Sequence, residues 1–179
     1  KERAMRIYNK GGVNAVLDEI ENFDRTGGYS YYSSSNRALF YFESIEYSGF
    51  NAKYLYYKTL VNDVKLNKEE LLKVIKALPE ISSNSTKGSL LREILFNYEL
   101  DSYAKEKFLD ATESLSYNTE RGSVLRAFQG KYKIDREIAG EFFDVIDGMS
   151  INSEKGNVIK PLLETQKLEK VVLSELINT

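Results

Sequence analysis

The sequence predicts an all-α fold, a right-handed α-solenoid (an α–α superhelix) of about five stacked helical hairpins. Three observations lead to this prediction. A block of residues recurs at a constant spacing, apolar residues within each unit follow helical spacing, and polar residues that start helices recur at fixed places.

The recurring block begins at Ile81, returns at Leu115 and returns again at Met149, so its two steps are equal. We call the interval from Ile81 to Leu115 the repeat step. When the three copies are aligned, several equivalent positions, which we call columns, keep their residue type in all three. These columns are Ser82, Ser116 and Ser150; Asn84, Asn118 and Asn152; and Gly88, Gly122 and Gly156. Such regular self-similarity is the sequence signature of a repeat architecture.

The second half of each unit repeats more faintly, at Leu66, Leu100, Ile134 and Leu168. A degenerate copy of the block begins at Ile45, and a first unit consists of helices at 12–23 and 34–44 around a loop at 24–33. We therefore expect a single helical-repeat domain over residues 1–179. Its units are predicted at residues 11–44, 45–80, 81–114, 115–148 and 149–179.

Within a unit the apolar residues lie at helical intervals, as Leu91, Ile94 and Leu95 show. Asn or Asp stands near most helix starts, and Asn67 with Glu70 has the spacing of a capping box. One short hairpin cannot bury its apolar face alone, so neighbouring hairpins must stack. We expect Leu91, Leu125 and Ile159 to be buried at equivalent places.

The repeat step matches the period of tetratricopeptide repeats, which is about 34 residues. Those repeats, however, need a small residue where Leu100 and Ile134 stand. The ankyrin signature is absent as well. By elimination the units are HEAT/ARM-like.

The segment at 6–20 and the later Ser-x-Asn-x-x-Lys/Arg-Gly blocks resemble bacterial helical repeats that are appended to beta-lactam-sensor-type membrane metallopeptidases. The resemblance implies an extracytoplasmic accessory module, periplasmic or secreted. The His-Glu-x-x-His motif of those peptidases is missing, so the resemblance carries over no catalytic residue.

Composition narrows the function further. The net charge of −2 gives no general attraction to nucleic acid, and the longest apolar runs are far shorter than the roughly 20 residues that cross a bilayer. The chain has no histidine and no cysteine, which removes the commonest catalytic bases, nucleophiles and transition-metal ligands. We therefore expect no enzymatic activity, no cofactor and no transition-metal site.

Because the chain opens at Lys1 without a signal segment, we interpret it as a mature form or an excised domain.

Three groups of residues have both a structural and a functional interpretation. For Gly88, Gly122 and Gly156 we favour close helix packing over an anion site. Basic residues recur at two equivalent positions of the repeat. For both sets we favour a solvated face that pairs with Asp110 and Asp144 over a binding site for an anionic ligand. The first basic column is Lys87, Arg121 and Lys155, and the second is Arg92, Arg126 and Lys160. The tyrosines before residue 60 suit either a capped core or a binding surface, and we favour the core.

These observations predict a non-catalytic module for protein–protein interaction, monomeric and with an unidentified protein partner. The alternative is a regulatory or sensing domain of a larger membrane-associated bacterial protein. In stacked hairpins the second helices commonly line the binding face. The exposed side chains predicted on these helices change from basic to acidic along the stack. The basic residues are Lys73 and Lys76, and the acidic ones, which we call the acidic ridge, are Asp110, Glu113, Glu141, Asp144 and Asp147. Either this ridge binds a basic segment of the partner, or its charges only solvate the surface.

Overall fold

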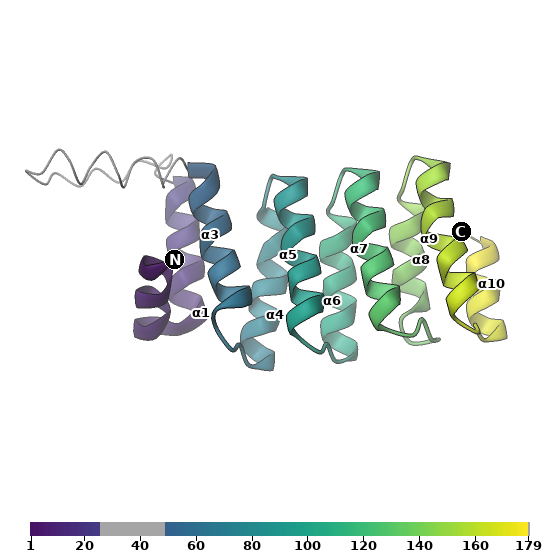
Figure 1. The fold of residues 1–179 in the computed structure, drawn as a ribbon, viewed down its shortest axis with the longest axis horizontal. Helices are drawn as coiled ribbons and strands as arrows, with labels where there is room; N and C mark the ends of the chain where they lie inside the picture. The colour runs from purple at the N-terminus through teal and green to yellow at the C-terminus, as the bar shows by residue number, and fades with distance from the viewer. Residues whose placement is uncertain (26–48, 179) are drawn as a thin grey trace, which may run out of the picture. The chain divides into compact units, whose positions relative to one another are not determined.

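The computed structural model describes residues 1–25 and 49–178, and all regular secondary structure in these residues is helical (Figure 1). The elements are α1 (Glu2–Arg25), α3 (Gly49–Asn62), α4 (Lys68–Ala77), the short 3-10 helix η1 (Leu78–Glu80), α5 (Asn84–Asn97), α6 (Ser102–Glu113), α7 (Asn118–Lys131), α8 (Ala139–Asp147), α9 (Asn152–Thr165) and α10 (Lys170–Asn178). The prediction of an all-α fold is confirmed for the described part of the chain.

The chain divides into two compact units, Lys1–Val74 and Ile75–Thr179. The predicted single repeat domain, with its five unit boundaries, stays a prediction.

In the first unit α1 packs against α3. The helix predicted at 12–23 lies inside α1, which begins earlier, at Glu2, and is kinked at Gly12, where φ is 66° and ψ is −160°. Glycine adopts this backbone conformation without the steric cost that a side chain would add. The predicted helix at 34–44 lies outside the described residues, as does most of the loop predicted before it.

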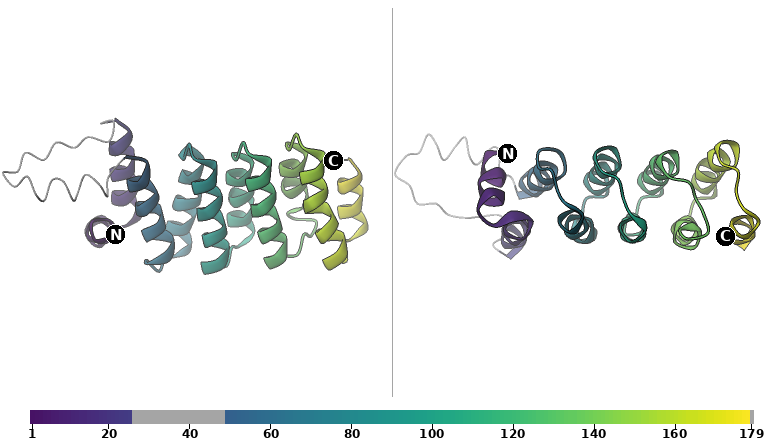
Figure 2. Two further views of the ribbon diagram at one scale, coloured as in Figure 1. Left: turned by 45° about the horizontal axis from the view of Figure 1, so that its top comes forward. Right: turned by 90° about the horizontal axis from the view of Figure 1, so that it is seen from below.

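In the second unit the helices form two rows, which the end-on view in Figure 2 separates. In one row α5 packs against α7 and α7 against α9, while in the other α6 packs against α8 and α8 against α10. We call α5–α6, α7–α8 and α9–α10 hairpins, because short connections join their helices. Each helix therefore packs mainly on the equivalent helix one repeat away.

The core of this unit is built from equivalent positions. Leu91 and Leu125 are fully buried, as predicted, but the prediction for Ile159 is wrong, since its side chain is only half-buried. The physical reason is its position in the last hairpin, where no further described helix covers the outer side of α9. The rings of Phe108 and Phe142 both stack on Phe128, with centroid distances of 5.6 and 6.1 Å.

The capping box predicted at Asn67 is present. The Glu70 amide donates to Asn67 Oδ1 and the Asn67 amide donates to Glu70 Oε2, each at 3.0 Å. Asp101 caps α6 by accepting from the amide of Ala104. At α5, however, the cap is Ser83 rather than Asn84, because Ser83 Oγ accepts from the amide of Thr86.

The connections inside the hairpins are fixed by side chains one repeat later. The hydroxyl of Tyr132 accepts from the Leu100 amide, and Gln166 Oε1 accepts from the Ile134 amide, both at 2.8 Å. Lys131 Nζ donates to the carbonyl oxygens of Leu95 and Tyr98. These bonds satisfy backbone groups that the helix ends leave unpaired.

Candidate functional site

The five carboxylates of the predicted ridge lie on two neighbouring helices. Asp110 and Glu113 belong to α6, while Glu141, Asp144 and Asp147 belong to α8. All are exposed except Glu141, which is half-buried. Because α6 and α8 pack side by side, the ridge extends over adjacent helices of one row.

Two of the five carboxylates have a lysine beside them. Asp110 lies 2.8 Å from Lys107 Nζ, and Asp147 lies 3.2 Å from Lys155 Nζ. The hydrogen bond to Asp110, followed by that to Glu106, raises the pKa of Lys107 above its usual range. Within the described part of the chain, Glu141 and Asp144 have no cation at ion-pair distance. The negative charge of the ridge is therefore least compensated at Glu141 and Asp144.

Glu113 lies near a buried cation. The guanidinium of Arg121 donates to the backbone oxygens of Glu113 and Leu115, at the end of α6. Burial lowers the pKa of Arg121, and the charge of Glu113 opposes this shift. The charge of the exposed Glu113 carboxylate thus partly compensates the buried Arg121 cation.

The first basic column holds helix ends together. The buried Lys87 ammonium donates to Pro79 O and to both oxygens of Ser114, over 2.9–3.1 Å. Burial lowers the pKa of Lys87, while the charge of Glu80 raises it. Arg121 does the same at α6, and Lys155 reaches Asp147 at the end of α8. Cations at helix C-termini are stabilising, so this column belongs to the scaffold.

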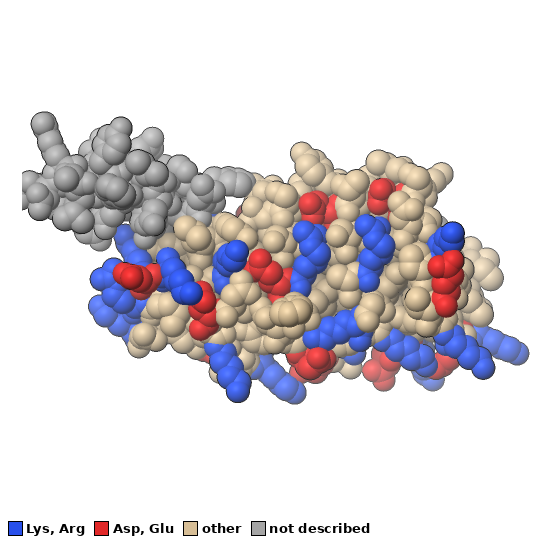
Figure 3. Space-filling view, viewed as in Figure 1, with Lys and Arg blue, Asp and Glu red and all other residues tan. Residues whose placement is uncertain are grey.

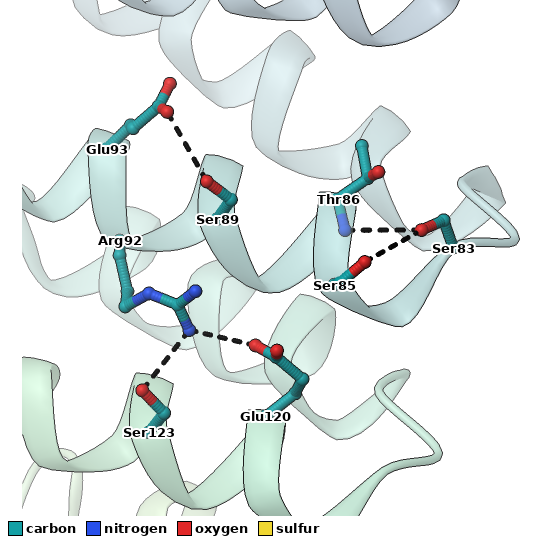
Figure 4. A network of polar contacts seen from close by, with 8 residues as sticks. All are labelled: Ser83, Ser85, Thr86, Ser89, Arg92, Glu93, Glu120 and Ser123. Carbon is teal, nitrogen blue, oxygen red and sulfur yellow. Dashed lines mark hydrogen bonds and ion pairs between the residues drawn. The ribbon is translucent and has the colours of Figure 1, made fainter. Parts of the chain in front are cut away.

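The second basic column pairs one hairpin with the next, but with different partners from those predicted. Arg92 Nη1 lies 3.0 Å from Glu120 and Arg126 Nη1 lies 3.8 Å from Glu154, so the expected pairing with Asp110 and Asp144 is wrong. Figure 4 shows Arg92 between Glu120 and Ser123 of α7. The pairs run along the row of α5, α7 and α9, where Figure 3 shows basic side chains recurring with acidic ones beside them. Glu120 and Glu154 stand in the first turns of α7 and α9, which brings them opposite α5 and α7, the preceding helices of the same row.

The glycine column makes room for these same carboxylates. A Cβ atom placed on Gly88 would lie 2.5 Å from Glu120 Oε2, and one on Gly122 would lie 3.2 Å from Glu154 Oε2. At Gly156, no described atom other than the neighbouring backbone of its own helix and its adjacent residues lies within 4 Å of that position. Close approach thus explains Gly88 and Gly122, and the approaching group is a side chain of the next hairpin.

The Asn and Ser columns form hydrogen bonds between hairpins, a role that was not predicted. Asn84 Nδ2 donates to Ser116 Oγ at 3.0 Å, and the Ser116 amide donates to Asn84 Oδ1 at 2.7 Å. The same two bonds join Asn118 to Ser150, each at 3.0 Å. Helix-start asparagines are ordinarily interpreted as caps, but the matching Ser column in the following unit was the signal for a bond between hairpins.

The tyrosines that the structure describes favour the core interpretation. Before residue 60, Tyr56 and Tyr57 are buried on α3, whereas Tyr8 and Tyr54 are half-buried. Tyr29, Tyr31 and Tyr32 lie outside the described residues.

No group of three acidic side chains in residues 1–25 and 49–178 is arranged to hold a metal ion. In the same ranges, none of the helices combines the length and apolar character needed to span a membrane.

In comparisons with known proteins, no family model matches the chain, and no curated protein or solved structure is significantly similar to it.

Proposed function

We propose that the chain is a HEAT-like α-solenoid that acts as a non-catalytic module for binding a protein partner through the acidic ridge. The solenoid is supported by the two rows of the second unit, in which equivalent helices pack on one another and equivalent side chains form the same bonds in successive repeats. Such arrays present extended surfaces whose usual role is binding.

The observation that carries the proposal is the pair Glu141 and Asp144 on α8. Both carboxylates are without a described ion-pair partner, and the neighbouring helix α6 adds Asp110 and Glu113. A partner with a basic segment is drawn toward such a surface during diffusion. Salt weakens this attraction, because the screening length is about 8 Å at physiological ionic strength.

The test begins with affinity capture of partners from the source cells, followed by association kinetics with a captured protein. In the double variant Glu141→Lys/Asp144→Lys, association is expected to slow at least about tenfold at low salt, because steering by opposite charges raises association rates by this order or more. The helical signal and the urea midpoint should stay near those of the parent.

A control variant, Glu2→Lys/Asp18→Lys, makes the same change of charge on exposed residues of α1. It should leave the association rate within about twofold of the parent, because the charges lie outside the ridge. Equal slowing by both variants would mean that net charge, rather than the ridge, governs association.

A further inference from the structure

Lys76, near the end of α4, and Tyr103, in the first turn of α6, contact each other at the surface of the second unit. Lys76 Nζ donates to the Tyr103 hydroxyl oxygen at 3.2 Å and lies 5.2 Å from the centre of the ring. Lys107, one turn later on α6, places its Nζ 5.6 Å from the centre of the same ring. Although Tyr103 is 49% exposed and Lys76 is exposed, these contacts hold both side chains in place.

Both side chains keep hydrogen-bond donors for a further group. The Tyr103 oxygen accepts from Lys76, so the hydroxyl proton is not used in this bond. Within the described residues this proton has no acceptor, and Lys76 has no carboxylate at ion-pair distance. Lys107, by contrast, is paired with Glu106 and Asp110, at 2.7 and 2.8 Å.

We call Lys76 and Tyr103 the donor pair, because they present N–H and O–H donors side by side. A carboxylate has two acceptor oxygens and a negative charge, so it can accept from both side chains at once. Hydrogen bonds in which both groups are charged are stronger than neutral ones. The donor pair therefore has the chemistry of a binding site for a carboxylate.

The donor pair lies beside the acidic ridge. Ser102 Oγ, at the start of α6, donates to Glu137 Oε2, just before α8, at 3.4 Å. Lys107 and Glu141 are one repeat step apart and take equivalent places on these two neighbouring helices. Since packed helices lie about 8–10 Å apart and one turn rises about 5.4 Å, Tyr103 lies about 10 Å from Glu141. This distance corresponds to about three residues of an extended chain.

The charge of this surface reverses from one repeat to the next. Glu137 stands where Tyr103 stands one repeat earlier, and Glu141 stands where Lys107 stands. The uncompensated charge is thus positive at Lys76 and negative at Glu141 and its neighbour Asp144. A ligand that matches both places needs charges of both signs.

We propose that the partner segment bound by the ridge also carries an Asp or Glu side chain, whose carboxylate binds the donor pair. This carboxylate stands about three residues from the basic side chains that lie over Glu141 and Asp144. The inference rests on the proposed function and adds the order of charges in the partner. A segment with basic residues alone would place a like charge near Lys76, so the donor pair discriminates between partners.

The probes are short synthetic peptides with blocked ends, titrated into the full chain at low salt and followed by NMR. The bipolar peptide Glu-Glu-Ser-Ser-Lys-Lys is compared with Gln-Gln-Ser-Ser-Lys-Lys, and both are also made in the reverse order. One bipolar peptide should bind about threefold to tenfold more tightly than its Gln counterpart, because it adds an ion pair. It should shift the amide signals of both Tyr103 and Asp144.

Two variants test the donor pair. Tyr103→Phe keeps the ring but removes the hydroxyl donor, and it should reduce the advantage of the bipolar peptide at least about twofold. Lys76→Gln should abolish this advantage, so that the two peptides bind within about twofold of each other. Tyr117→Phe and Lys65→Gln make the same changes at exposed residues elsewhere and should leave it unchanged. The urea midpoints of all four variants should stay near that of the parent.

The ridge variant separates this inference from the proposed function. Glu141→Lys/Asp144→Lys should abolish the binding of both peptides at α8. If the two peptides bind the parent equally and Tyr103→Phe changes neither, the donor pair does not select the partner, while the ridge still binds basic segments. If neither peptide shifts the signals of Glu141 and Asp144, both proposals are wrong.

A further titration uses sodium acetate and inorganic phosphate. Neither anion should shift the Tyr103 signal at concentrations at which the bipolar peptide saturates it, because the ridge adds nothing to their binding. Saturation by either anion at the same concentration would overturn the proposal, since the donor pair would then be a site for free anions.

Discussion

Asn84 of α5 and Ser116, which lies two residues before α7, are joined by hydrogen bonds to both the serine amide and the serine hydroxyl. Asn118 and Ser150 repeat this relationship one hairpin later. A side-chain amide thus fixes the spacing of successive hairpins through a backbone group.

This relationship predicts that Asn118→Ala lowers the free energy of unfolding by about 1–2 kcal/mol, because the Ser150 amide loses its acceptor. Asn152→Ala is the matched control at the third equivalent position, where the side chain is exposed. It should change stability by less than about 0.5 kcal/mol. Urea unfolding followed by circular dichroism measures both, and equal losses would show that the asparagines act within their own helices.

Replacing glycine by alanine is expected to affect stability differently at Gly156 and at Gly88. Gly156→Ala should raise stability by up to about 1 kcal/mol, since alanine is the better helix former and no described atom beyond the adjoining backbone and adjacent residues lies within 4 Å. Gly88→Ala should gain less or lose stability, because the added Cβ displaces the Glu120 carboxylate and disturbs its pair with Arg92.

A double-variant cycle checks this explanation by urea unfolding. With Glu120→Ala in the background, Gly88→Ala should recover the gain seen at Gly156. If Gly88→Ala stays unfavourable there, the obstacle is the packing of the helices and not the carboxylate.

Tyr132 predicts a dependence of stability on pH. Burial raises the pKa of Tyr132, against the lowering effects of the Leu100 amide and Lys131. The unfolded chain therefore loses this proton near pH 10 while the folded chain keeps it, so the contribution of Tyr132 is complete below pH 10 and falls as the pH rises further.

The comparison of the parent with Tyr132→Phe in urea at several pH values tests this prediction. At neutral pH the variant should be less stable by about 1–3 kcal/mol, since the buried Leu100 amide loses its acceptor. The difference should shrink above pH 10. Tyr117→Phe, at a position that is 65% exposed, should show no such change.

The absence of histidine and cysteine from the sequence predicts that the chain binds no transition metal tightly, because only hard oxygen ligands are left. Titration with zinc in a calorimeter should give no stoichiometric site of micromolar affinity. A saturable site at that affinity would contradict the prediction.

The sequence by itself determined the helices and their spacing. Apolar residues at helical intervals, the capping pair Asn67 and Glu70, and the constant repeat step are local or periodic features, and these predicted the all-α fold and the burial of Leu91 and Leu125. These features can be predicted from the sequence because each depends on the backbone geometry of one helix or on the repetition of one unit.

Only the tertiary structure decided which side chains meet across hairpins. Arg92 pairs with Glu120 and not with Asp110, Asn84 binds Ser116 in place of capping its own helix, and Ile159 is left half-buried at the last hairpin. A sequence repeat shows that equivalent residues recur at equal intervals along the chain. It does not determine the rotation and offset between neighbouring hairpins in space. These depend on how the buried side chains pack, and they determine which charged and polar groups come within bonding distance.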